Sequence, residues 1–270
     1  TGKVAGDGGF TLYSKDSRNY HLHLAHPENA FKGPVVINGG WLSLHANGAA
    51  PVDCAGLTLT NSSIRLYGGE TYRLPAMTFY GAGMVTNDVF CRGGFVKIVK
   101  KGDGALTLTT GVGAEALELE AGSVAITGAA EAADMPVFGS VKAKPGAAIT
   151  SALPVTFTNE LSFSYQDLSG ETPVLTVDGA LRFDAKATFV ATGTKLAKGT
   201  YKLVYASGGI TGVPTATQSS NKIYIDTDGK TLMVGTEGGD WPEESASATW
   251  VGGAADALMT TMSNWEGTPD

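Results

Sequence analysis

Short runs in which apolar and small polar residues alternate recur along the chain, and each of the clearest runs follows a glycine. Alternation with a period of two is typical of strands with one buried face, and glycine permits a turn at positive φ. The turn glycines are Gly40, Gly56, Gly104, Gly122, Gly179 and Gly229. The inward face after them is predicted to hold Leu42, Leu44, Leu57, Leu59, Leu106, Leu108, Val124, Ile126, Leu181 and Phe183.

The gaps between these glycines are 16, 48, 18, 57 and 50 residues, and the larger gaps are near multiples of a unit of about twenty. A degenerate repeat of that length favours an all-β parallel solenoid, in which the inner residues of each coil stack on those of the next. The alternative is an antiparallel β-sandwich, which also has many short strands and glycine-rich turns.

The same pattern predicts the domain organisation. Residues 1–235 are predicted to form the β-solenoid domain, residues 236–249 an acidic linker that contains Pro and Gly, and residues 250–270 the beginning of a following module. Residues 113–122 contain good helix formers but alternate as a strand does. Residues 129–135 and 255–265 each have room for a helical turn or two.

Two segments resemble the autotransporter-associated β-strand repeat of bacterial surface proteins. The first contains Asn29, Phe31, Gly33, Val35 to Ile37, Asn38, Gly40, Leu42 and Leu44, and the second contains Lys100, Gly102, Gly104, Leu106 and Leu108. Trp250 with its two following glycines, and Asn264 with Trp265, resemble the start of another array. The resemblance is best over residues 1–128 and implies a right-handed parallel β-helix in an exported passenger region.

Charge and composition exclude several classes of partner. The chain has 19 Lys and Arg against 26 Asp and Glu, a net charge of −7, and scattered basic residues, which is unlike a nucleic-acid-binding surface. No apolar run reaches the ~20 residues of a membrane helix, and we expect no membrane insertion of this segment. Cys54 and Cys91 lie 37 residues apart, about two coils, so we expect free thiols.

Histidines give the most suggestive cluster for metal chemistry. His21 and His23 share one face of a predicted strand, with His26, Glu28 and His45 nearby. Because Leu22 and Leu24 take the opposite, inward face, we interpret these imidazoles as solvent-facing and predict no metal site. Asp226, Asp228 and Gly229 lack the further ligands of a calcium loop, so we predict a hairpin turn between two strands.

Two other groups of residues are candidates for cleaving or binding polysaccharides. Arg65, Arg73, Asp88 and Arg92 are the nearest approach to a catalytic charge group, and solvated surface is the simpler interpretation. Trp41 points away from Leu42, and with Tyr67, Tyr72 or Tyr80 it offers rings for stacking on sugars, unless the rings pack in cross-strand ladders.

The sequence therefore predicts a non-enzymatic extracellular scaffold, a structural or adhesion segment of a larger bacterial surface or secreted protein, associated with the outer membrane. We expect a monomer with glycans or host and cell-surface components as partners, with no catalytic residues, no cofactor and no metal. The alternatives are a polysaccharide-active β-helix enzyme, a lyase or a glycosidase, and a carbohydrate-binding β module. A cleft with carboxylates and basic groups would favour the enzyme, and an exposed aromatic platform would favour the binding module.

Overall fold

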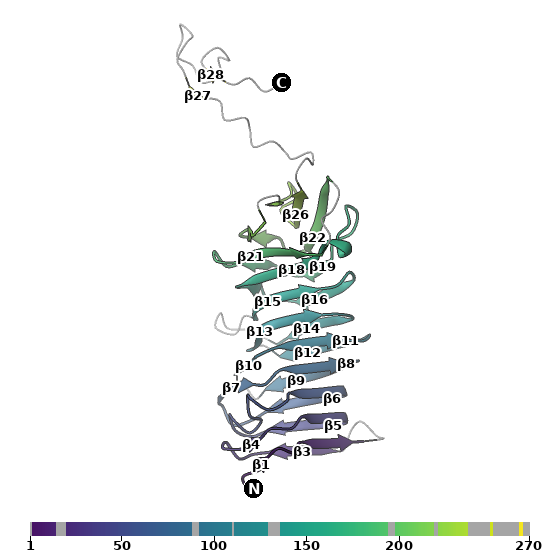
Figure 1. The fold of residues 1–270 in the computed structure, drawn as a ribbon, viewed down its shortest axis with the longest axis vertical. Helices are drawn as coiled ribbons and strands as arrows, with labels where there is room; N and C mark the ends of the chain where they lie inside the picture. Colours follow the sequence, from purple (N-terminus) through teal and green to yellow (C-terminus); the bar gives the residue numbers. More distant parts are fainter. Residues whose placement is uncertain are drawn as a thin grey trace.

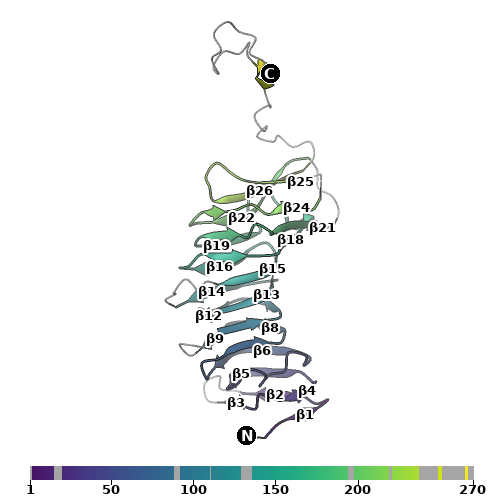
Figure 2. The same ribbon diagram turned by 90° about the vertical axis from the view of Figure 1, so that its left-hand side faces the viewer.

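The computed structural model describes residues 2–14, 20–87, 92–109, 111–128, 136–193, 198–218 and 221–236, together with the backbone of two short pairs farther on. The chain winds as a right-handed parallel β-solenoid, which confirms the predicted fold class and excludes the sandwich. Its coils stack along the long axis of the molecule (Figure 1) and remain in register when the view is turned (Figure 2).

The strands form three lateral faces, and the chain visits them in a fixed order in each coil. The first face contains β2 (Phe10–Tyr13), the first halves of β5 (Val35–Leu44) and β6 (Leu57–Leu66), β8 (Met77–Tyr80), β11 (Ile98–Lys101), the second halves of β13 (Val112–Leu119) and β15 (Val137–Ala143), β18 (Glu160–Ser164), β21 (Thr188–Thr192) and β24 (Thr215–Ala216).

The second face contains β3 (His21–Leu24), the second halves of β5 and β6, β9 (Gly83–Asn87), β12 (Ala105–Thr109), β14 (Ser123–Thr127), β16 (Ala147–Ser151), β19 (Leu175–Asp178) and β22 (Thr200–Ala206). The third face contains β1 (Ala5–Gly6), β4 (Ala30–Phe31), β7 (Thr71–Leu74), β10 (Arg92–Phe95), the first halves of β13 and β15, β17 (Val155–Phe157), β20 (Leu181–Phe183) and β23 (Ile210–Thr211). All of these neighbours pair in parallel.

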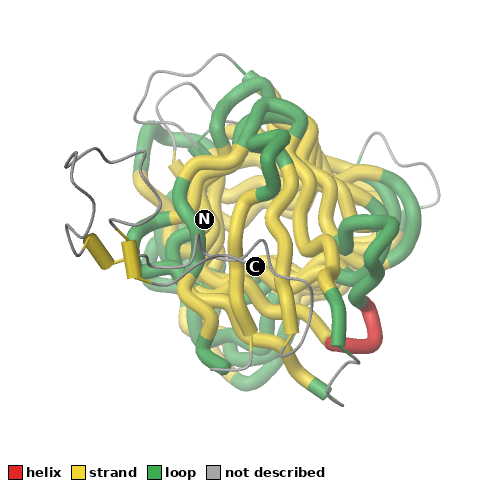
Figure 3. The backbone as a smooth tube through the Cα atoms, turned by 90° about the horizontal axis from the view of Figure 1, so that it is seen from above, coloured by secondary structure: helices red, strands yellow, loops and turns green. Residues whose placement is uncertain are grey.

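The number of residues in one coil varies along the solenoid. Ile98 pairs with Leu117, 19 positions on, whereas Leu161 pairs with Phe189, 28 positions on. The loops absorb the difference at the corners, outside the ring of strands that Figure 3 shows along the axis. The predicted unit of about twenty residues is therefore the short end of the observed range.

The predicted inward residues line the core. Leu42, Leu44, Leu106 and Leu108 are fully buried, and Ile126 is only 5% exposed, which confirms the register. All six turn glycines have positive φ. Gly39 and Gly40 bend β5 from the first face to the second without ending the strand, at φ of 74° and 91°. The turn in this unit is thus a corner and not a hairpin.

The two ends of the solenoid differ. At the C-terminal end, β25 (Asn221–Ile225) and β26 (Thr231–Thr236) form the predicted antiparallel hairpin, and β26 also pairs antiparallel with β22. Of the stretch 113–122, residues 113–119 form strand in β13, as predicted, and the last three residues lie in the bend that follows. Residues 129–135, most of the predicted linker and the segment 251–264 lie outside the described residues. Of the final segment the structure describes the antiparallel pair β27 (Thr249–Trp250) and β28 (Trp265–Glu266).

Candidate functional site

The outer surface of the second face carries a row of rings, which we call the imidazole ladder: His21, His23, Trp41, His45 and Tyr67. His21 pairs with Trp41 in the register of β3 and β5, and their nearly parallel rings are 6.1 Å apart. His21 and His23 are exposed, whereas Leu24, the last residue of β3, is buried. The prediction that these imidazoles face solvent is confirmed.

Two rings of the ladder are joined by a hydrogen bond. Nδ1 of His23 lies 2.9 Å from Nε2 of His45, while the ring centres are 5.2 Å apart. The two nitrogens are much closer to each other than the two ring centres are. The rings therefore meet edge to edge along the line that joins their centres. One ring therefore donates its N–H and the other accepts.

The Tyr67 ring has two close neighbours. His45 stacks on it at 4.5 Å with an interplanar angle of 2°, and the Arg65 guanidinium lies over the ring, 4.6 Å from its centre. A sugar ring stacks on an open aromatic face, and these two neighbours already contact the face or faces of Tyr67 that they lie over. The rings pack as a cross-strand ladder, with their edges toward solvent.

The other candidate aromatics are not brought to this platform. Tyr72 is only 2% exposed, and its hydroxyl donates to the carbonyls of Leu44 and Tyr67. Tyr72 is therefore excluded as a candidate for stacking on sugars, because its alternation with Arg73 in β7 turns it inward. Tyr80 is exposed, but it belongs to β8 on the first face.

The described residues contain no cluster of three or more His, Cys, Asp or Glu side chains arranged to hold a metal ion. Asp226 and Asp228 lie in the turn between β25 and β26, as predicted, with Gly229 at φ 67°. The Asp228 carboxylate accepts hydrogen bonds from the backbone of Lys230 and from the backbone and hydroxyl of Thr231. These bonds lower the pKa of Asp228, because they favour its charged form.

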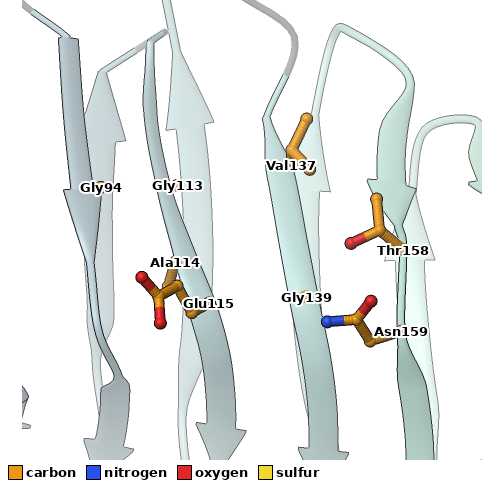
Figure 4. A pocket seen from close by; sticks show the side chains of 8 residues that line it. All are labelled: Gly94, Gly113, Ala114, Glu115, Val137, Gly139, Thr158 and Asn159. Atoms are coloured by element: carbon orange, nitrogen blue, oxygen red, sulfur yellow. The ribbon is translucent and has the colours of Figure 1, made fainter.

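An open groove of about 490 Å³ crosses the third face (Figure 4). It is lined by Gly94, Gly113, Ala114, Glu115, Val137, Gly139, Thr158 and Asn159. A Cβ on Gly113 would lie 2.5 Å from the Val137 carbonyl, and one on Gly139 would lie 2.1 Å from the Glu115 carbonyl. Close approach of neighbouring coils thus explains both glycines without a ligand.

The polar chemistry of this groove is limited. Arg73 reaches across the Gly94 position to Glu115, two coils farther on, with a distance of 3.3 Å between Nη2 and Oε1. Both side chains are more than half exposed. Glu115 is the single carboxylate among the lining residues, whereas hydrolysis of a glycoside normally employs two.

The two described members of the candidate charge group, Arg65 and Arg73, lie on different faces of the solenoid. Arg73 pairs with Glu115 on the third face, whereas Arg65 lies over Tyr67 on the second. Asp88 and the side chain of Arg92 lie outside the described residues.

Lys100 is a buried cation that the sequence analysis missed. It follows Ile98 by two positions in β11, so alternation places it in the inner column between Phe79 and Leu119. Its Nζ donates to the carbonyls of Lys101 and Gly102 at 2.9 and 2.6 Å. Burial lowers the pKa of Lys100 through desolvation, against an opposing effect of Asp103. Lys100 thus closes the corner that follows β11.

Cys54 is a buried free thiol whose pKa is raised, chiefly by burial. The predicted free state of Cys54 is confirmed, and Cys91 lies outside the described residues.

Within the described residues no helix has the length and apolarity needed to cross a bilayer. Comparison of the chain with protein-family models, with curated proteins and with solved structures gives no match. The stacked coils and their lateral faces are therefore the basis for any proposal about function.

Proposed function

We propose that this chain is a non-enzymatic scaffold segment of a larger bacterial surface or secreted protein, which holds its lateral faces out to glycans or cell-surface components. The observation that carries the proposal is the continuous apolar core under three flat outer faces. Each coil is stabilised by its neighbours, so such a stack gives length and rigidity, and its outer positions are free for recognition. The resemblance to the autotransporter-associated repeat supports the extracellular placement.

The chemistry of the outer faces also supports a scaffold. The groove on the third face has one ion-paired, solvent-exposed carboxylate, and the ladder on the second face has its rings packed on one another. Neither arrangement resembles the enclosed, water-excluding environment in which acid–base groups act on a substrate.

The alternative of a polysaccharide-active enzyme has one observation in its favour, the Arg73–Glu115 pair in the groove of the third face. A carboxylate beside a basic group is the minimum equipment for cleaving an acidic polysaccharide.

The experiment compares the full chain with Glu115→Gln and Arg73→Gln variants on a panel of acidic and neutral polysaccharides. Release of reducing ends and formation of unsaturated products are followed over long incubations. We expect no release above the buffer control from any of the three proteins. Release by the native chain that either substitution abolishes would overturn the proposal in favour of the enzyme.

A second experiment treats intact source cells with protease and then probes them with an antibody to this segment. Loss of the epitope is expected, and full protection would contradict the extracellular placement.

A further inference from the structure

We infer that the imidazole ladder is a proton-dependent binding site for an acidic polysaccharide. The inference rests on the proposed role of the solenoid as a displayed scaffold, and it names the partner class of one of its faces. Its basis is the edge-to-edge bond between His23 and His45, the exposed ring edges of the ladder, and the charges that surround them.

The proton count of the histidine pair sets its charge. Two neutral imidazoles carry two protons on four ring nitrogens, and one of those protons lies in the bond between His23 and His45. When one more proton is taken up, three protons serve the four ring nitrogens: the bond becomes charge-assisted, the two nitrogens outside the bond both carry a proton, and the pair bears one positive charge. A further proton would leave neither nitrogen of the bond able to accept, so the hydrogen-bonded pair carries at most one positive charge.

The stacking of His45 on Tyr67 favours the protonated pair. An aromatic face attracts a cation that lies over it, and His45 lies over Tyr67 at 4.5 Å. The Arg65 guanidinium also lies over this ring, 4.6 Å from its centre, so the ladder ends beside a permanent positive charge. Protonation of the pair therefore extends a cationic strip that Arg65 begins.

The described side chains around the ladder oppose an anion weakly. The outward residues of β3, β5, β6 and β9 on this face include no carboxylate: His21, His23, Trp41, Ser43, Ser63, Arg65, Met84 and Thr86. Two acidic groups at the corners of the described part of the chain are engaged elsewhere. Glu70 accepts the backbone N–H of Asn47, and Glu28 pairs with Lys3 at 3.7 Å while its backbone donates to His26.

The geometry favours an extended polymer over a small ion. The ladder spans three coils, and parallel strands lie about 4.8 Å apart, so its donors recur at that spacing along the axis. Because the rings pack against one another, recognition uses hydrogen bonds and charge at their nitrogens, which suits carboxylate or sulfate groups more than sugar faces.

The test measures binding of the full chain to three immobilised polysaccharides: polygalacturonate, dextran sulfate and unsubstituted dextran. Each is measured at low salt at about pH 5.5 and about pH 7.5, on either side of the ordinary histidine pKa. The sequence pI is 5.1, so the chain is net negative at both values and its overall charge opposes an anionic polymer. We expect binding of one or both anionic polymers that is about tenfold tighter at the lower pH, and none of dextran.

Three variants locate the effect. In His23→Asn/His45→Asn the gain at low pH is expected to vanish, and in Arg65→Gln binding is expected to weaken at both pH values. Lys97→Gln, which removes a positive charge from the first face, is the matched control and is expected to retain the gain. Thermal melts of all variants confirm that each is folded.

The anionic polymers separate the two sources of charge: preference for polygalacturonate assigns carboxylates, and preference for dextran sulfate assigns sulfates. Equal binding of dextran would overturn the inference, and so would a gain at low pH that survives the double substitution. Absence of binding to every polymer would also overturn it, while the protease and antibody experiment on cells would still stand for the scaffold.

Discussion

The inner and outer columns of the coils obey different rules, although they alternate along the same strands. The inner column Leu42, Ile64, Val85, Leu108 and Ile126 of the second face is apolar throughout. The outer column beside it contains His21, Trp41, Ser63, Met84 and Thr107. The stacking of coils therefore dictates what lies inside, and the outside is left to vary.

The outer columns also differ from face to face. On the first face charges alternate between coils, with Lys97 2.8 Å from Glu118 and Lys101 3.1 Å from Glu120. On the second face rings take the same role in holding neighbouring coils together. A parallel solenoid thus tolerates ion pairs or stacked rings at equivalent outward positions.

Among the substitutions that test the difference between inner and outer columns, loss of an inner leucine is expected to have the largest effect on stability. Leu108→Ala removes a fully buried side chain from a stacked column, and we expect a loss of ~2–5 kcal/mol in the free energy of unfolding. Thr107→Ala, one position away on the outer column, is the control and should change it by less than about 0.5 kcal/mol. Denaturant unfolding measures both, and similar losses from the two variants would show that the inside and outside are not distinguished as we describe.

Lys100 is the exception that sharpens the rule, because it is a charged residue in an inner column. Lys100→Met keeps most of the packing but leaves the carbonyls of Lys101 and Gly102 without their donor, and should cost ~1–3 kcal/mol. Lys100→Ala adds a cavity beside Phe79 and Leu119 and should cost more. Denaturant unfolding ranks the two, and a methionine variant more stable than the native chain would show that the ammonium is not needed at the corner.

Sequence patterns predicted the inner columns well and the outer contacts poorly, for a physical reason. Leu106 and Leu108 were placed inward from their own period of two after Gly104, which is local information. The bond between His23 and His45 depends on the coil length, which is set by loops of irregular size. A signal was present, because His23, His45 and Tyr67 follow one another at 22-residue intervals. Lys100 likewise takes an inner position by simple alternation with Ile98.

A surface ion pair of the first face should contribute much less than either buried group. Lys97 and Glu118 are about one third exposed, and a pair of this kind contributes ~0.2–1 kcal/mol. A double-mutant cycle with Lys97→Gln and Glu118→Gln measures the coupling energy, which should fall as salt is raised. A coupling energy above this range that salt does not reduce would contradict the interpretation of these columns as solvated decoration.

The Asp228 carboxylate is expected to make a still smaller contribution to stability, and that contribution can be measured as a function of pH. Its pKa is lowered from the ordinary value of 3.8, so its contribution to stability is present above that value and is lost as the pH falls through the lower, folded-state pKa. The native chain should therefore be more stable than Asp228→Asn at neutral pH, with the difference narrowing below about pH 4. Thr231→Val removes one of the donors and should reduce that pH-dependent difference. A stability difference that does not change with pH would show that the charge of Asp228 contributes nothing.

Removal of metal ions is expected to have no effect on stability. This prediction concerns both the imidazole ladder and the hairpin turn between β25 and β26. The described residues bring no set of three metal-binding side chains together, the nitrogens of His23 and His45 are joined to each other, and the oxygens of Asp228 are occupied by Lys230 and Thr231. A structural metal contributes directly to folding free energy, so its removal lowers the melting temperature. We therefore expect the melting temperature of the full chain to be the same with and without EDTA. A drop of many degrees would mean that a cation holds part of this molecule together. Repeating the melts with His23→Asn/His45→Asn and with Asp228→Asn would then show which of the two places binds it, since the responsible variant alone would no longer respond to EDTA.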